Sequence, residues 1–234
     1  KAPIEAGFHS YGISSHSPLP FETRWSLSKG NVEAYLTEIK RLQEKYAGQI
    51  ELYVGMEIDY LNDDWGPAVE YFQRMPLDYR IGSVHLVTEE QTGEIMDMDG
   101  KFEDFRENLR LIFHDDLKYL VEAYFKASSR MVELGGFDFV AHLDKISMNG
   151  SLMDSTLTEQ EWYNRLLWDY MSLIAKKGVM VEVNTKAYTK KGMMFPNVKY
   201  FKWLKELNIP VMVNSDAHLP QLVNDNRALA FEWL

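Results

Sequence analysis

The sequence predicts an α/β fold in which parallel strands alternate with covering helices. Short apolar, β-branched segments recur along the 234 residues, and longer segments with apolar residues at helical spacing lie between them. Strand–helix–strand order requires crossover connections and therefore parallel pairing. Because the expected strands are nearly continuous apolar runs, we expect both faces of the sheet to be covered. No linker or low-complexity stretch divides the chain, which favours one domain over residues 1–234.

Six strands and five helices are expected. The strands are expected at 9–16, 51–60, 79–87, 137–144, 179–185 and 209–218. The helices are expected at 31–48, 67–75, 102–136, 159–178 and 198–208. Residues 88–101 should form a loop or hairpin before the third helix. His114 falls within that helix and His9 at the start of the first strand, so both are expected to be structural.

The composition excludes several classes of protein. A formal net charge of −10 would repel nucleic acids and anionic membranes, so neither is expected as a partner. There is no cysteine, which excludes disulfides and thiolate metal ligands and fits a reducing, cytoplasmic setting. No apolar run approaches the length of a transmembrane span.

Each expected strand ends in a residue that can bind a metal or hydrogen-bond a ligand. These residues are His16, Glu57, His85, His142, Asn184, and Asp216 with His218. The carboxyl ends of the strands of an α/β barrel converge on one mouth, so dispersed residues can form one cluster there. A single such histidine is more often structural, but several at the same end of successive strands favour a site. Imidazoles and carboxylates without thiolates suit Zn²⁺, Mn²⁺ or Fe²⁺, ions that activate water for attack on phosphorus or carbonyl carbon.

Basic and aromatic residues just beyond the strand ends could hold an anionic substrate. Lys186, Lys190 and Lys191 follow Asn184, and Arg24 and Trp25 follow His16. Lysine and arginine suit a phosphate dianion, and a tryptophan face can cover an imidazole or ammonium group. Solvated loop charge is the alternative interpretation for any one of these lysines.

The segment "IMDMDGK" (95–101) imitates the Asp-x-Asp nucleophile motif of another class of phosphatase. That chemistry needs the first aspartate at the end of a buried strand near the start of the chain. Here the preceding residues are polar and turn-like. We therefore reject this interpretation and expect Asp97 and Asp99 to be solvated.

Six segments of this sequence resemble, in order, the PHP (polymerase and histidinol phosphatase) family: "YGISSHSPLPF", "GMEIDY", "RIGSVHLV", "FVAHLDKI", "EVNTKAY" and "VNSDAH". The similarity is greatest to the monofunctional histidinol-phosphate phosphatases. The resemblance implies a distorted (β/α)7 TIM-like barrel. It also implies hydrolysis of a small phosphorylated substrate, L-histidinol phosphate, to L-histidinol and phosphate by a metal-bound hydroxide, a step of histidine biosynthesis. The alternatives are another PHP phosphoesterase, acting on nucleotides or phosphotyrosine, and a catalytically silent binding domain.

The resemblance further implies two or three divalent ions and assigns their ligands. Glu57 would bridge two ions, and Asp216 would bind one of that pair. His85 and His142 would complete the shell of the second ion, and His16 and His218 would hold the third. Asp216 and His218 would serve catalysis, with His218 one candidate for the proton donor.

The family's first motif is the one departure. A His-x-His on the first strand is absent before His9. We therefore expect the first strand and part of the first helix to be missing from this sequence, and the barrel to be open.

Overall fold

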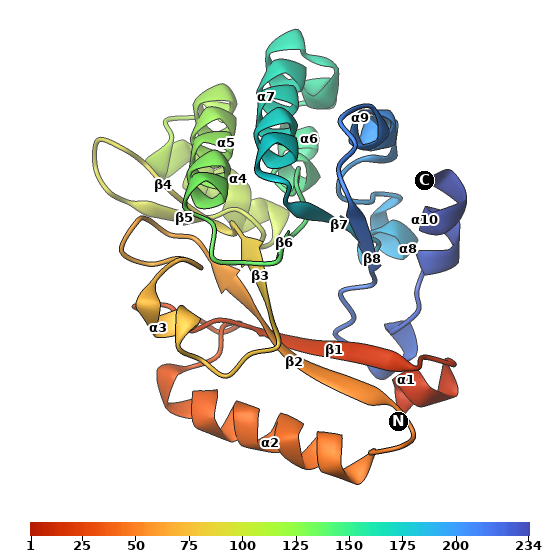
Figure 1. Cartoon of the computed structure of the whole chain (residues 1–234). Helices are drawn as coiled ribbons and strands as arrows, with labels where there is room; N and C mark the ends of the chain where they lie inside the picture. Colours follow the sequence, from red (N-terminus) through yellow and green to blue (C-terminus); the bar gives the residue numbers. More distant parts are fainter.

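The computed structural model describes all 234 residues, and its centre is one curled parallel sheet (Figure 1). The strand order is β1-β2-β3-β6-β7-β8, and every neighbouring pair is parallel. The strands are β1 (Ser10–His16), β2 (Glu51–Asp59), β3 (Tyr79–Ser83), β6 (Phe139–Val140), β7 (Met180–Asn184) and β8 (Val211–Asn214). All six expected strands are present, and the α/β prediction is confirmed.

Apart from α1 and α10 at the two ends of the chain, the helices lie between successive strands, and the longer ones cover the outer face of the sheet. The helix α2 lies along β1 and β2, whereas α5 and α7 lie on the side of β3, β6 and β7 (Figure 1). The helices are α1 (Ala2–Glu5), α2 (Val32–Lys45), α3 (Glu70–Gln73), α4 (Phe102–Ile112), α5 (Leu117–Leu134), α6 (Ser147–Met153), α7 (Glu161–Lys177), α8 (Tyr188–Lys191), α9 (Phe201–Glu206) and α10 (Arg227–Trp233). None of them is both long enough and apolar enough to cross a membrane.

The segment between β3 and β6 differs from the sequence prediction in two respects. The expected hairpin is present, because β4 (Leu86–Thr88) pairs antiparallel with β5 (Ile95–Asp97), but it begins within the strand predicted for 79–87, which ends as β3 at Ser83. The single helix predicted for 102–136 is wrong. The chain breaks into α4 and α5 at His114 and Asp115, whose φ angles of 55° and 61° are left-handed and end a right-handed helix. Asp116 then starts α5 by accepting a hydrogen bond from the Tyr119 backbone N–H.

The sheet does not close into a complete barrel. The strands β1 and β8 are its two edges, and a cavity of about 1130 Å³ is lined by residues from both of them. The ring of Tyr79 lies across the inside of the sheet. A Cβ at Gly55 or Gly12 would come within 2.2 or 2.4 Å of Tyr79 side-chain atoms, so only glycine fits at these two strand positions.

The main hydrophobic core lies between the sheet and the helices α5 and α7. It contains 33 buried residues, including Val140 and Val183 from the sheet and Leu120 and Leu167 from the helices. Burial of each large apolar side chain contributes about 1.5–3 kcal/mol. This core fixes β6 and β7, and so positions the polar residues that follow them.

Candidate functional site

The polar residues predicted from the strand ends do converge at the carboxyl ends of the parallel strands. His16 ends β1 and lies beside Glu57 of β2 in the pairing register. The next strands contribute through their last residue or the residues just after it. These residues are His85, His142, Asn184, Asp216 and His218.

Four of these side chains form what we call the Glu57 group: His16, Glu57, His85 and His142. Glu57 Oε1 lies 3.1 Å from His142 Nε2 and 3.6 Å from His85 Nε2. Glu57 Oε2 lies 3.5 Å from His16 Nδ1. Ligand atoms of Glu57, His85 and His142 all lie within 4.8 Å of one another, and these three residues are at most 9% exposed. The group therefore aims a carboxylate and imidazoles at one buried point.

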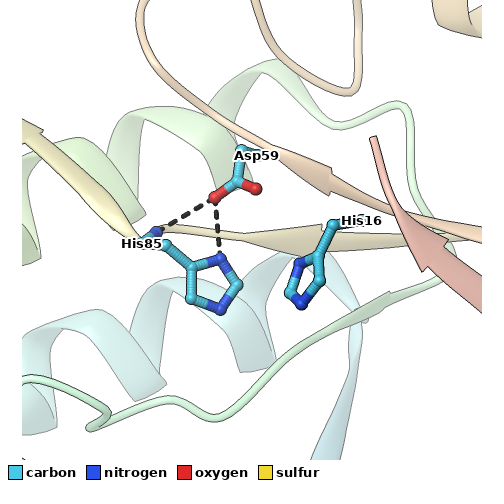
Figure 2. A group of neighbouring side chains, drawn as sticks. All are labelled: His16, Asp59 and His85. Carbon is cyan, nitrogen blue, oxygen red and sulfur yellow. Dashed lines mark hydrogen bonds and ion pairs between the residues drawn. The ribbon is translucent and has the colours of Figure 1, made fainter. Parts of the chain in front are cut away.

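Asp59 supports this group, and the sequence analysis missed it. Its Oδ1 accepts hydrogen bonds from His85 Nδ1 at 2.8 Å and from the His85 backbone N–H at 3.1 Å (Figure 2). The carboxylate thereby turns Nε2 of the ring toward Glu57, as carboxylates commonly do for metal-binding histidines. Because Asp59 follows Glu57 by two residues on β2, strand alternation places both on the same face.

The charges in the Glu57 group depend on one another. Burial alone would raise the pKa of Glu57, but His16, His142 and His85 outweigh it and hold that pKa well below its usual range. Burial lowers the pKa of His85, but Asp59 and Glu57 raise it, and the net result is about 10. Burial is the main cause that lowers the pKa of His142. Glu57 is therefore ionised, and His85 holds a proton that a bound metal ion would replace.

The Glu57 group fits a divalent ion on two grounds. Its imidazole and carboxylate donors are those that Zn²⁺, Mn²⁺ and Fe²⁺ accept. In addition, His16 Nδ1 and Asp59 Oδ2 are buried without a hydrogen-bond partner. An unpaired buried polar group costs about 1–3 kcal/mol, and a cation at this point would offset that cost.

The remaining predicted residues form a second cluster, the Asp216 group: Asn184, Lys186, Asp216 and His218. Asp216 Oδ2 lies 3.1 Å from Lys186 Nζ and accepts a hydrogen bond from Asn184 Nδ2, also at 3.1 Å. Lys186 Nζ is 3.2 Å from His218 Nε2. Neither Asp216 nor His218 belongs to a set of three metal-capable atoms within 4.8 Å. The four side chains of the Asp216 group are paired with one another, and a lysine is one of them.

Glu182 links the two groups, and it was also missed. It is buried, and its carboxylate accepts hydrogen bonds from the His142 backbone N–H, Asn184 Nδ2 and Asn214 Nδ2 at 3.0–3.1 Å. Burial raises the pKa of Glu182 to about 7, with Asp216 and Glu57 adding to the rise. Glu182 precedes Asn184 by two residues on β7, so strand alternation could have identified it.

Trp25 packs against the histidines from the loop after β1. Its ring centroid is 5.1 Å from that of His16 and 5.7 Å from that of His85. Its indole Nε1 donates to Asp97 Oδ2 at 3.1 Å, so the prediction that Asp97 is solvated is wrong. Arg24 is exposed beside it, at a second cavity of about 560 Å³ that Trp25 and Asp97 also line.

The cations after β6 and β7 differ in their surroundings. Lys145, missed in the sequence, is buried and lies 3.1 Å from Asp99, so the prediction of a solvated Asp99 is wrong too. No local pattern signals a pair separated by 46 residues. Lys190 and Lys191 are exposed on α8, and neither forms an ion pair. The three lysines predicted to bind substrate thus differ: Lys186 is held at the site by Asp216, whereas Lys190 and Lys191 are exposed on α8.

Fold and site together define an α/β half-barrel with a candidate metal centre at the carboxyl ends of its strands. The pattern of the PHP domain family matches residues 1–186, and the chain belongs to this family.

Three similar proteins carry the name histidinol phosphatase in one form or another. The histidinol-phosphatase of Bacillus subtilis is 24% identical over 238 residues, which cover 92% of this chain and 84% of that protein. A crystal structure of a candidate histidinol phosphatase from Listeria monocytogenes has a TM-score of 0.80 at 22% identity and covers 97% of this chain and 90% of its own. The histidinol phosphate phosphatase of Lactococcus lactis was solved with zinc, L-histidinol and phosphate. It has a TM-score of 0.72 at 19% identity, and the match covers 99% of this chain and 84% of that one.

Proposed function

We propose that this protein is a metal-dependent phosphomonoesterase that hydrolyses L-histidinol phosphate to L-histidinol and phosphate. The observation that carries the proposal is the Glu57 group, a buried set of metal-capable atoms in a chain of the PHP family. The name of the Bacillus subtilis relative supports the substrate. The zinc, L-histidinol and phosphate bound by the Lactococcus lactis protein support both the substrate and the metal.

The metal would be held by Glu57, His85 and His142, with His16 beside them. Bound there, Zn²⁺, Mn²⁺ or Fe²⁺ would lower the pKa of a coordinated water toward neutrality and offset charge on the phosphate oxygens. Asp59 keeps His85 oriented for this task. Burial of the group excludes bulk water, which strengthens every charge interaction within it.

The substrate would be held by residues around the mouth. Lys186, Lys190 and Lys191 offer ammonium groups and Arg24 a guanidinium group, which suit phosphate oxygens. The amide of Asn184 adds a neutral donor, and the Trp25 ring offers a face for the imidazole or ammonium group of histidinol.

Hydrolysis breaks the ester P–O bond as a water oxygen bonds to phosphorus, and the leaving alkoxide then needs a proton. We assign this proton to His218, whose side chain is 55% exposed at the mouth. The backbone carbonyl of Asp216 accepts from His218 Nδ1 at 3.0 Å. Because a carbonyl can only accept, Nδ1 carries hydrogen in that contact, and the proton for the alkoxide would be the one that Nε2 shares with the Lys186 ammonium 3.2 Å away.

We also propose that residues 1–234 form a single PHP domain whose barrel is closed by one further parallel strand between β1 and β8. Both strands are unpaired edges, and the cavity of about 1130 Å³ is lined by both. Full closure removes sheet edges, which otherwise invite aggregation. A crystal structure in which β1 and β8 pair directly with each other would contradict this proposal.

A phosphate-release assay tests the proposed function. The protein is loaded with Zn²⁺ or Mn²⁺ and offered L-histidinol phosphate, p-nitrophenyl phosphate, phosphotyrosine and a dinucleotide. We expect the highest kcat/KM with L-histidinol phosphate and loss of release after chelation. Preference for a nucleotide or phosphotyrosine would indicate another phosphoesterase. No release from any of them would indicate a silent binding domain.

A further inference from the structure

The position of Lys186 bears on how many metal ions the centre holds. We propose that the Lys186 ammonium takes the place of a divalent ion at Asp216 and His218, so that the centre loads metal only at the Glu57 group. The inference rests on the proposed function only in treating the site as a metal centre, and not on the identity of the substrate.

The ligand atoms of Asp216 are already engaged. Oδ2 faces both Lys186 Nζ and Asn184 Nδ2 at 3.1 Å. Oδ1 lies 3.4 Å from His218 Nδ1. A zinc–carboxylate bond is about 2.0–2.2 Å long, so an ion bound by Oδ2 would displace the ammonium or sit directly against it.

The imidazole of His218 is engaged as well. Its Nδ1 donates to the Asp216 backbone carbonyl, so Nε2 is the ring nitrogen left to accept a hydrogen bond. Lys186 Nζ lies 3.2 Å from this atom and donates to it. The lone pair that a metal ion would use is therefore directed at the ammonium group.

The Glu57 group shows the opposite condition in the same site. His16 Nδ1 and Asp59 Oδ2 are buried without hydrogen-bond partners, and no lysine or arginine forms an ion pair with the converging atoms of Glu57, His85 and His142. One half of the centre therefore has unpaired buried polar atoms where a metal ion fits, and the other has a lysine between its two metal-capable side chains. A fixed ammonium, 35% exposed, can still face a phosphate oxygen, but a chelator cannot remove it.

Metal stoichiometry tests the inference. The wild type, Lys186→Met, Asp216→Asn and the double variant are saturated with Zn²⁺ and counted by native mass spectrometry. We expect the wild type and Asp216→Asn to bind the same number of ions. Lys186→Met should bind one more, because methionine removes the charge at similar length, and the double variant should lose that ion again. Lys186→Arg, which keeps the charge, should match the wild type.

Two results would overturn the inference. One is a wild type that loses an ion on Asp216→Asn, because Asp216 would then already be a ligand. The other is a folded Lys186→Met with no additional ion, because no ion position would then exist there. If circular dichroism shows that Lys186→Met does not fold, the comparison of the wild type with Asp216→Asn still decides whether Asp216 is a metal ligand. Correct loading without release of phosphate from histidinol phosphate would contradict the proposed function alone.

Discussion

The two halves of the site pair their charged groups in different ways. In the Glu57 group, a low-pKa carboxylate lies among three imidazoles, and His16 Nδ1 and the adjacent Asp59 Oδ2 are buried without hydrogen-bond partners. In the Asp216 group, an aspartate, an amide, a lysine and a histidine satisfy one another within 3.2 Å. Similar residue types at similar strand ends thus serve different tasks. What separates the halves is that a lysine lies between the metal-capable side chains of the Asp216 group, whereas no lysine or arginine pairs with those of the Glu57 group.

The largest expected effect comes from His85→Ala, which breaks the Glu57 group. It removes a buried metal-capable nitrogen from the set of three that converge on one point. Metal affinity and kcat should each fall by more than about 100-fold, beyond the range seen when only a supporting partner is lost. Metal content and phosphate release measure this. His114→Asn, at an exposed position between α4 and α5, is the matched control and should change neither. Retained metal and turnover in His85→Ala would remove His85 from the centre.

Asp59→Asn should have the next largest effect. The amide of asparagine can still contact His85, but the substitution removes the negative charge that holds the Nδ1–H group of His85. Loss of such a supporting carboxylate costs about 10–100-fold in metal affinity. A competition titration with a chelating dye measures it. Asp63→Asn, an exposed aspartate paired with Arg130, serves as the control and should leave the affinity unchanged. Equal affinities for Asp59→Asn and the wild type would contradict the orienting role.

Metal binding at the Glu57 group should depend on pH. In the metal-free protein His85 keeps a proton up to a pKa of about 10, and a metal ion must displace it. Affinity therefore rises with pH below that value, by about tenfold per pH unit for one displaced proton. Calorimetry in two buffers of different ionisation enthalpy counts the released protons near neutral pH. Metal binding without release of a proton would show that the ion does not displace the proton of His85.

Arg24→Ala should have the smallest effect. Arg24 is exposed and makes no ion pair, so its loss should not disturb folding. If the guanidinium contacts the phosphate, KM should rise about tenfold with little change in kcat, which corresponds to about 1.4 kcal/mol. Arg106→Ala, at an exposed position on α4, controls for the loss of surface charge. Unchanged kinetics in Arg24→Ala would exclude Arg24 from the site.

The sequence was informative where the periodicity of strands carries the signal. Alternating strands and helices predicted the parallel sheet, and the polar strand ends predicted the residues that converge, including Glu57 and His142. The same alternation could have identified Asp59 and Glu182, each two residues from a predicted site residue.

Other features had no local signal. The contact of Lys145 with Asp99 joins two loops across 46 residues. The placement of Lys186 between Asp216 and His218 depends on how the turns after β7 and β8 meet. The break between α4 and α5 follows from two left-handed residues inside an apolar pattern that reads as one helix.

The most direct test of this account is anomalous diffraction from crystals soaked in Mn²⁺ or Zn²⁺. It locates each ion instead of counting it. We predict a peak bounded by Glu57, His85 and His142, with Lys186 Nζ still between Asp216 and His218. A peak between Asp216 and His218, with Lys186 turned away, would contradict the division of the site into two halves.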